Sequence, residues 1–109
     1  MKNHYLDEFV KSCLDEIPER GEEKFLDWET LMTILVYEGL IRLSLPLLKD
    51  WLKLGVAGAD LIRQKIKKRL IDYAHEKELD FPQAEKAVET IVNKISEKNI
   101  EKIIKAQEE

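Results

Sequence analysis

Apolar residues recur every three or four positions along most of this chain, which is the spacing of amphipathic α-helices. The first such stretch is predicted to start at an Asn3 cap and to run to about Ile17, because Pro18 cannot continue a helix. Asp27 is placed to cap the next helix, which is predicted over residues 28–43. Each of these helices has an apolar face that must pack against a neighbour.

A third helix is predicted over residues 45–54, with Ser44 as its cap, and a fourth over residues 59–77. Asp80 and Gln83 have the spacing of a capping box, which predicts that a further helix begins there. The sequence contains no alternating pattern of the kind that indicates a strand. The predicted fold is therefore all-α, a compact bundle of five helices, or six, with short connections.

The most apolar stretch, residues 31–48, is predicted to lie at the centre of this bundle. It holds twelve apolar side chains in eighteen positions, a content that could also suit a membrane span. Glu38 and Arg42 argue against a span, because each would cost about 2.5–3.5 kcal/mol near the middle of a bilayer. We therefore expect central helices at about 28–43 and 45–54, no membrane contact, and a single helical domain over the whole chain.

The composition agrees with a helical globular protein. Hydrophobic residues make up 44% of the 109 positions and charged residues 37%, with only 4 Gly and 3 Pro. The single cysteine, Cys13, excludes an intramolecular disulfide. The N-terminal segment lacks the apolar core of a signal peptide, so the expected location is the cytoplasm.

Groups that could carry catalysis are sparse. Cys13 falls in the middle of an apolar helix face, which is typical of a buried structural thiol. His4 and His75 are far apart in the sequence and do not form a metal-ligand pattern. There is also no glycine-rich phosphate loop and no His-Glu-x-x-His motif. We therefore predict no catalytic residue, no metal site and no cofactor.

Tyr37, Glu38 and Arg42 form the strongest candidate for a polar site. Glu38 and Arg42 are four residues apart on a predicted helix, so their side chains can pair. A carboxylate on a largely buried helix can have a raised pKa, as general bases and ligand-binding groups do. The same spacing also suits a structural ion pair near solvent. A small-molecule or enzyme site at these residues therefore stays an alternative.

Charge is distributed unevenly, although the formal net charge is only −4. Residues 1–30 contain nine acids and four bases, whereas residues 49–77 contain eight bases and four acids. A basic helix suggests nucleic-acid binding, because phosphate contacts come from Lys and Arg side chains on one face. The candidate contacts on helix 59–77 are Lys65, Lys68 and Arg69.

Residues 45–70 also have the order of parts found in a helix-turn-helix, with a glycine turn before a basic helix. Two positions depart from that motif: Trp51 is bulky where a small residue is expected, and Gln64 is polar where an apolar residue is expected. The sequence pI of about 5.3 is acidic as well. Nucleic-acid binding is therefore kept as an alternative function.

The apolar residues near the C-terminus change direction. Side chains of residues 84–95 share one face, whereas Ile100, Ile103 and Ile104 project about 130° away from it if the helix is straight. Either residues 97–109 protrude and a partner covers the isoleucines, or a bend returns these side chains to their own core. Because no Gly or Pro marks a bend, we favour the protruding extension.

Together these patterns predict a small cytoplasmic helical module for protein–protein interaction, without catalytic activity. Its partner is expected to be another protein or a second copy of the chain. Self-association is predicted to use Ile100, Ile103 and Ile104, because three exposed isoleucines would favour aggregation if nothing covered them.

Overall fold

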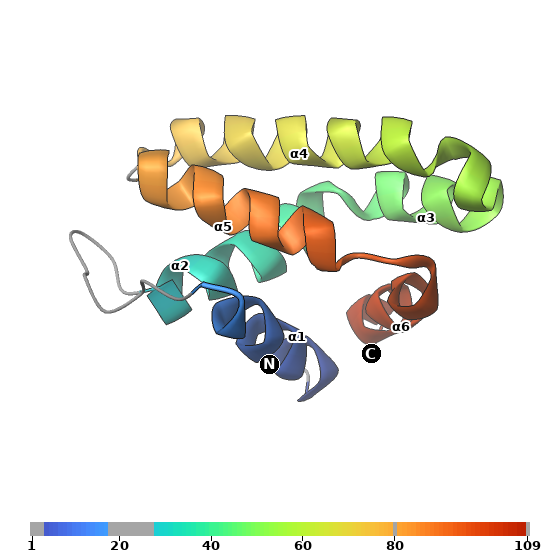
Figure 1. Ribbon diagram of the computed structural model, residues 1–109, viewed down its shortest axis with the longest axis horizontal. Helices are drawn as coiled ribbons and strands as arrows, with labels where there is room; N and C mark the ends of the chain where they lie inside the picture. The colour runs from blue at the N-terminus through green and yellow to red at the C-terminus, as the bar shows by residue number, and fades with distance from the viewer. Residues whose placement is uncertain (1–3, 18–27, 80, 109) are drawn as a thin grey trace.

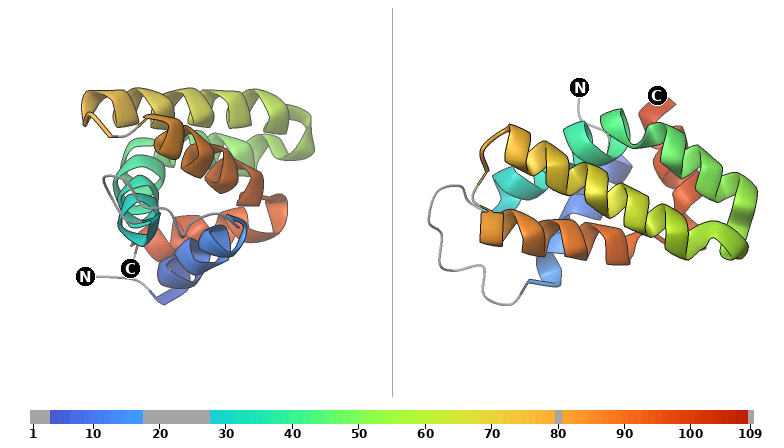
Figure 2. Two further views of the ribbon diagram at one scale, coloured as in Figure 1. Left: turned by 60° about the vertical axis from the view of Figure 1, so that its left-hand side comes forward. Right: turned by 90° about the horizontal axis from the view of Figure 1, so that it is seen from above.

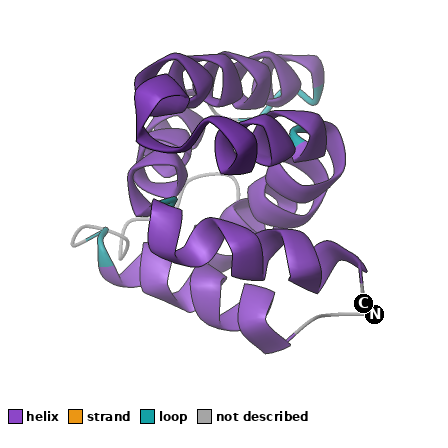
Figure 3. Ribbon diagram, turned by 90° about the vertical axis from the view of Figure 1, so that its right-hand side faces the viewer, coloured by secondary structure: helices purple, strands orange, loops and turns teal. Residues whose placement is uncertain are grey.

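Helices form every regular element in the part of the chain that the computed structural model describes, residues 4–17, 28–79 and 81–108 (Figure 3). The predicted all-α fold is therefore confirmed. The elements are, in chain order, α1 (His4–Asp15), α2 (Trp28–Ile34), the π-helix η1 (Leu35–Leu43), α3 (Leu45–Leu54), the 3₁₀-helix η2 (Gly55–Gly58), α4 (Ala59–Glu76), α5 (Phe81–Lys94) and α6 (Glu97–Glu108).

The helices pack in layers around one apolar core. Figures 1 and 2 show α4 on one side of the molecule and α1 and α6 on the other, with α2, η1, α3 and α5 between them. In the core, α4 packs against α5, α3 and η1, while α6 packs against α3 and α1. The predicted central position of residues 28–43 and 45–54 follows from these contacts, since they lie between the two outer layers.

Ser44 separates the two central helices, as predicted, but its side chain does not cap the second one. Its carbonyl accepts a hydrogen bond from Leu48 N at 3.0 Å. Its hydroxyl is fully buried and has no partner among the described residues. Pro46 lies in the first turn of α3, where its missing N–H leaves no helical bond unmade. The predicted caps Asn3, Asp27 and Asp80 lie outside the described residues.

Residues 35–43 wind as a π-helix, although their sequence predicts an α-helix. The last of its i→i−5 bonds joins Ser44 N to Gly39 O across 3.1 Å. A π-helix has more residues per turn than an α-helix. Buried positions accordingly recur every four to five residues, and Glu38 and Arg42 stay on the solvent side. Gly39 faces α4 so closely that an added Cβ would stand 2.5 Å from Leu70 Cδ2.

The chain bends between α5 and α6, which corrects the predicted C-terminal extension. Ile100, Ile103 and Ile104 are 1%, 0% and 7% exposed and belong to the protein's own core. Residues 97–108 therefore do not protrude, and the isoleucines are not available to a partner. The prediction was wrong because it treated the absence of Gly and Pro as evidence for a straight helix, whereas side-chain hydrogen bonds make this bend.

Among the described residues, no single helix is both long and apolar enough to cross a membrane. One pair of helical stretches, Trp28–Leu43 and Leu45–Glu76, meets these criteria together, but it is bent by 67° at the junction.

Candidate functional site

The predicted ion pair between Glu38 and Arg42 is present on η1. Arg42 Nη1 and Glu38 Oε1 lie 3.0 Å apart, and the two side chains are 72% and 46% exposed. An ion pair in this much solvent contributes about 0–1 kcal/mol to stability. Tyr37 faces α1, where its hydroxyl donates to Asp7 Oδ1 at 2.7 Å. The three candidates are thus neighbours in sequence, but Tyr37 serves the α1–η1 contact and the pair is a solvated surface feature.

Tyr73 of α4 lies beside this pair. Partial burial raises the pKa of its phenol, and the negative charges of Glu38 and Glu76 raise the pKa further, while Arg42 lowers it. The shift is away from physiological pH, so it does not activate the phenol. A neutral phenol beside an exposed ion pair offers a hydrogen-bonding group but no activated base.

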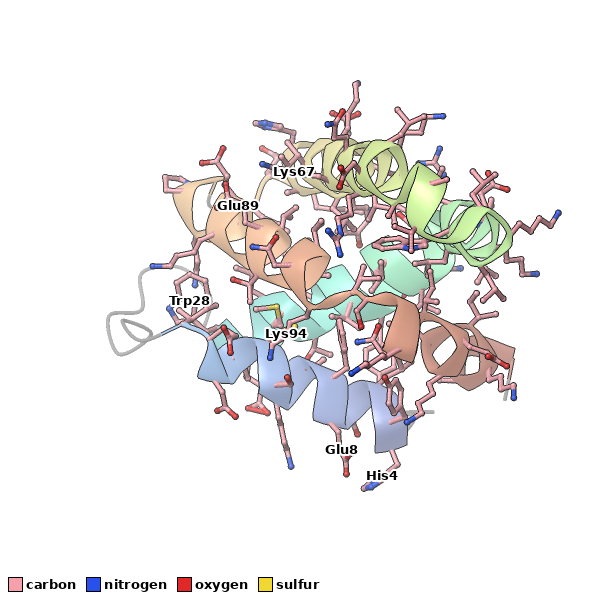
Figure 4. All side chains as sticks on the ribbon, turned by 45° about the vertical axis from the view of Figure 1, so that its right-hand side comes forward. His4, Glu8, Trp28, Lys67, Glu89 and Lys94 are labelled. Carbon is pink, nitrogen blue, oxygen red and sulfur yellow. The ribbon has the colours of Figure 1, made fainter. Side chains whose placement is uncertain are left out.

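Cys13 and the two histidines lie in different surroundings in the fold. Cys13 is fully buried, and burial raises the pKa of its thiol to about 12, with Lys94 lowering and Glu16 raising the value. His4 pairs with Glu8 across 2.9 Å on the exposed face of α1 (Figure 4). His75 is exposed in the last turn of α4. Within the described residues, no three His, Cys, Asp or Glu side chains come together as a metal site.

A polar hollow lies between α5 and the end of α1, lined by Thr90, Asn93 and Lys94 of α5 and by Glu16, the residue after α1. Lys94 points from α5 toward α1 (Figure 4) and its Nζ lies 3.4 Å from Glu16 Oε2. The two charges therefore neutralise each other, and this contact ties α5 to α1.

The basic residues of α4 are largely engaged within the molecule. Lys68 Nζ lies 3.5 Å from Asp72 Oδ2, and Arg69 Nη1 donates to the Leu43 carbonyl at 2.8 Å. Lys67 bridges to Glu89 of α5 across 3.6 Å (Figure 4). Lys65 is exposed. The predicted phosphate contacts Lys65, Lys68 and Arg69 are all on the surface, but two of them already have partners.

An exposed apolar surface lies at the turn between α3 and α4, where the sequence pattern did not predict one. Most large apolar side chains of the described residues are buried, yet Leu54 and Leu61 are each 56% exposed and Val56 is 74% exposed. Ala57 is exposed beside them. We refer to Leu54, Val56, Ala57 and Leu61 as the apolar tip. Exposed apolar patches of this kind commonly mark interaction sites.

The apolar tip is a defined surface. Leu54 folds over the turn, since an added Cβ at Gly58 would stand 2.8 Å from Leu54 Cδ1. Gly55 closes α3 with φ of 60°, a left-handed conformation that favours glycine. Leu61 follows one helical turn after Gly58. Figure 1 shows this corner at the right-hand end of the molecule, at the far end from α2.

A buried contact supports the base of the tip. The guanidinium of Arg63 on α4 lies 5.1 Å from the ring centroid of Trp51 on α3. Trp51 is 1% exposed, so this cation–π contact is shielded from water and couples the two helices. Arg63 also donates from Nη2 to the Ile95 carbonyl at 3.2 Å. The apolar tip therefore lies at the end of the helix pair α3 and α4. Arg63 links this pair to itself through Trp51 and to the end of α5 through the Ile95 carbonyl.

One feature of the sequence, the position of Leu61 on its helix, could have predicted this surface. On α4, the buried residues Ile62, Ile66 and Leu70 define one stripe. At about 100° per residue, Leu61 lies on the opposite side of the helix from that stripe. Projecting Leu61 in this way would have identified an apolar residue with no core to enter.

Comparisons of the chain with protein-family models, with curated proteins and with solved structures find no significant match. Its function is therefore inferred from the geometry of the molecule.

Proposed function

We propose that this protein is a cytoplasmic, non-catalytic helical module that binds another protein chain through the apolar tip. The observation that carries the proposal is the exposure of Leu54, Val56 and Leu61 within eight residues of sequence. Burying such side chains in an interface gives about 25 cal/mol for each Å² of apolar area removed from water. None of the three belongs to the apolar core of the described residues, which is formed by other side chains.

The two alternatives have weaker support. Nucleic-acid binding would need free cations on α4, whereas Lys68 is paired with Asp72 and Arg69 is bound to a backbone carbonyl. A small-molecule or enzyme site would need a group held away from water, whereas Glu38 and Arg42 are a solvated pair.

Photo-crosslinking followed by reconstitution tests the proposal. A benzophenone amino acid replaces Val56 in one variant and Glu85, an exposed position on α5, in the control. A protein captured from cell extract by the first variant alone is purified, and its affinity for the wild type is measured by calorimetry. We expect Leu54→Glu with Leu61→Glu to weaken binding at least tenfold, because two carboxylates would be desolvated in an apolar contact.

Leu52→Glu is the matched control, because Leu52 is 48% exposed and lies on the opposite flank of the buried stripe of α3 from Leu54. It should leave the affinity unchanged. The proposed function would be contradicted if the variants labelled at Val56 and at Glu85 captured the same protein equally. It would also be contradicted if Leu54→Glu with Leu61→Glu left the affinity unchanged.

A further inference from the structure

The charges beside the apolar tip are of opposite sign and unpaired. Lys53 precedes the turn at the end of α3, and Asp60 follows it in the first turn of α4. Both side chains are exposed, and no ion pair among the described residues involves either of them. From Leu52 to Ile62 these are the only charged residues, so the local net charge is zero.

We infer that the apolar tip binds the apolar tip of a second copy of this chain, across a two-fold axis that places Lys53 against the partner's Asp60. This inference rests on the proposed function and names its partner. In an isologous interface, a contact between residue i and residue j occurs twice, with the roles of the two copies exchanged. One cation before the turn and one anion after it therefore form two equivalent pairs around the axis.

Charge also separates this partner from others. Two copies would repel through their net charge of −4, but the tip itself is neutral and apolar, so the approach is least unfavourable there. An anionic membrane would attract a tip flanked by an excess of Lys or Arg, whereas this tip is flanked by one cation, Lys53, and one anion, Asp60. Pairing of two copies would neutralise Lys53 and Asp60 of each copy and would bury the apolar tips of both.

The expected dimer is weak. A standard protein interface buries about 800 Å² on each partner, and contacts well below that size are transient. A few exposed side chains at the tip form only the centre of such an interface. We therefore expect a Kd on the order of 100 µM.

Sedimentation equilibrium of the full chain between 10 µM and 1 mM, about a decade on each side of this Kd, provides the test. The wild type should pass from monomer to dimer, Leu54→Glu should remain monomeric, and Leu52→Glu should dimerise like the wild type. Lys53→Glu and Asp60→Lys should each weaken dimerisation at least tenfold. The double charge exchange should restore it to within about threefold, because each pair is re-formed with the signs reversed. Circular dichroism checks that each variant is folded.

A wild type that stays monomeric at 1 mM contradicts self-pairing, as does a dimer that survives Leu54→Glu or a double exchange that restores nothing. Failure of self-pairing does not by itself contradict the proposed function. The proposed function stands if a monomeric wild type still binds a different purified protein and Leu54→Glu abolishes that binding. It fails together with self-pairing if the tip instead co-sediments with vesicles of phosphatidylcholine and phosphatidylserine and Leu54→Glu abolishes this.

Discussion

Arg63 Nη2 donates to the carbonyl of Ile95 across 3.2 Å, at the first residue after α5. In a continuous helix that carbonyl would accept from Asn99 N, four residues later. Here Asn99 N donates to Ser96 O, Asn99 Nδ2 donates to Lys94 O at 2.8 Å, and Ser96 N donates to Asn99 Oδ1 at 2.9 Å. The backbone groups released by the bend are thus satisfied by two side chains, one local and one from α4.

Asn99→Ala should destabilise the protein by about 1–3 kcal/mol, because it leaves the Lys94 carbonyl and the Ser96 N–H without these partners in a partly buried place. Urea unfolding measures the change. Asn93→Ala on the exposed face of α5 is the control and should stay within about 0.5 kcal/mol of the wild type. Equal stability of the two variants would show that the Asn99 amide does not hold the bend.

Ile100→Glu combined with Ile103→Glu should unfold the protein, because both side chains are buried and two carboxylates would enter the core. Thermal melting by circular dichroism would show loss of the cooperative transition. The control Lys98→Gln with Lys102→Gln makes the same change in net charge at exposed positions and should melt like the wild type. A folded double-glutamate variant would mean that α6 does not pack as described.

The sequence was sufficient to predict the helices because their apolar residues follow the α-helical period and Pro and Gly mark several boundaries. It was insufficient for the π-helix, since a projection at the α-helical angle cannot show where i→i−5 bonding begins. The α5–α6 bend depends on Arg63, which is 32 positions away from Ile95 in the chain. The apolar tip was missed because the exposure of Leu54 depends on which helices pack beside α3, which is a property of tertiary structure.

Among the site candidates, local spacing was enough to predict the Glu38–Arg42 pair, because side chains four positions apart on a helix are neighbours. The Tyr37 partner could not be found in this way, since Asp7 lies 30 positions earlier on another helix. Contacts within one turn are thus readable from the sequence, and contacts between helices are not.

Tyr37→Phe should destabilise the protein by about 1–2 kcal/mol, because it removes the hydrogen bond to Asp7 at a partly buried contact between α1 and η1. The measurement is a double-mutant cycle with Asp7→Ala, in which chemical unfolding gives the stability of each variant. A coupling energy near zero between the two substitutions would mean that the Asp7–Tyr37 bond adds nothing to stability. Glu38→Ala, at the exposed pair next in sequence, should cost less than about 1 kcal/mol.

Cys13 should resist thiol reagents in the native state, because its side chain is fully buried and its pKa is raised to about 12. Labelling with a chromogenic disulfide should therefore be slow without denaturant and rapid in 6 M guanidinium chloride, a concentration above even the midpoint of about 5 M that marks hyperstable proteins. Fast native labelling would show that the first helix opens locally or that the thiol is accessible.

The same thiol predicts how stability changes at alkaline pH. Cys13 titrates near its ordinary pKa of 9.0 in the unfolded chain but near 12 in the folded protein, so between these values the unfolded state binds fewer protons. Its contribution to the free energy of unfolding is complete below pH 9 and is lost as the pH rises toward 12. Cys13→Ala lacks this term, whereas the titrations of Lys and Tyr residues are common to both proteins and cancel in the difference. From pH 8 to pH 10 the wild type should therefore lose about 1 kcal/mol relative to the variant, measured by urea unfolding under reducing conditions. A difference that stays constant over this range would mean that the native thiol titrates like an exposed one.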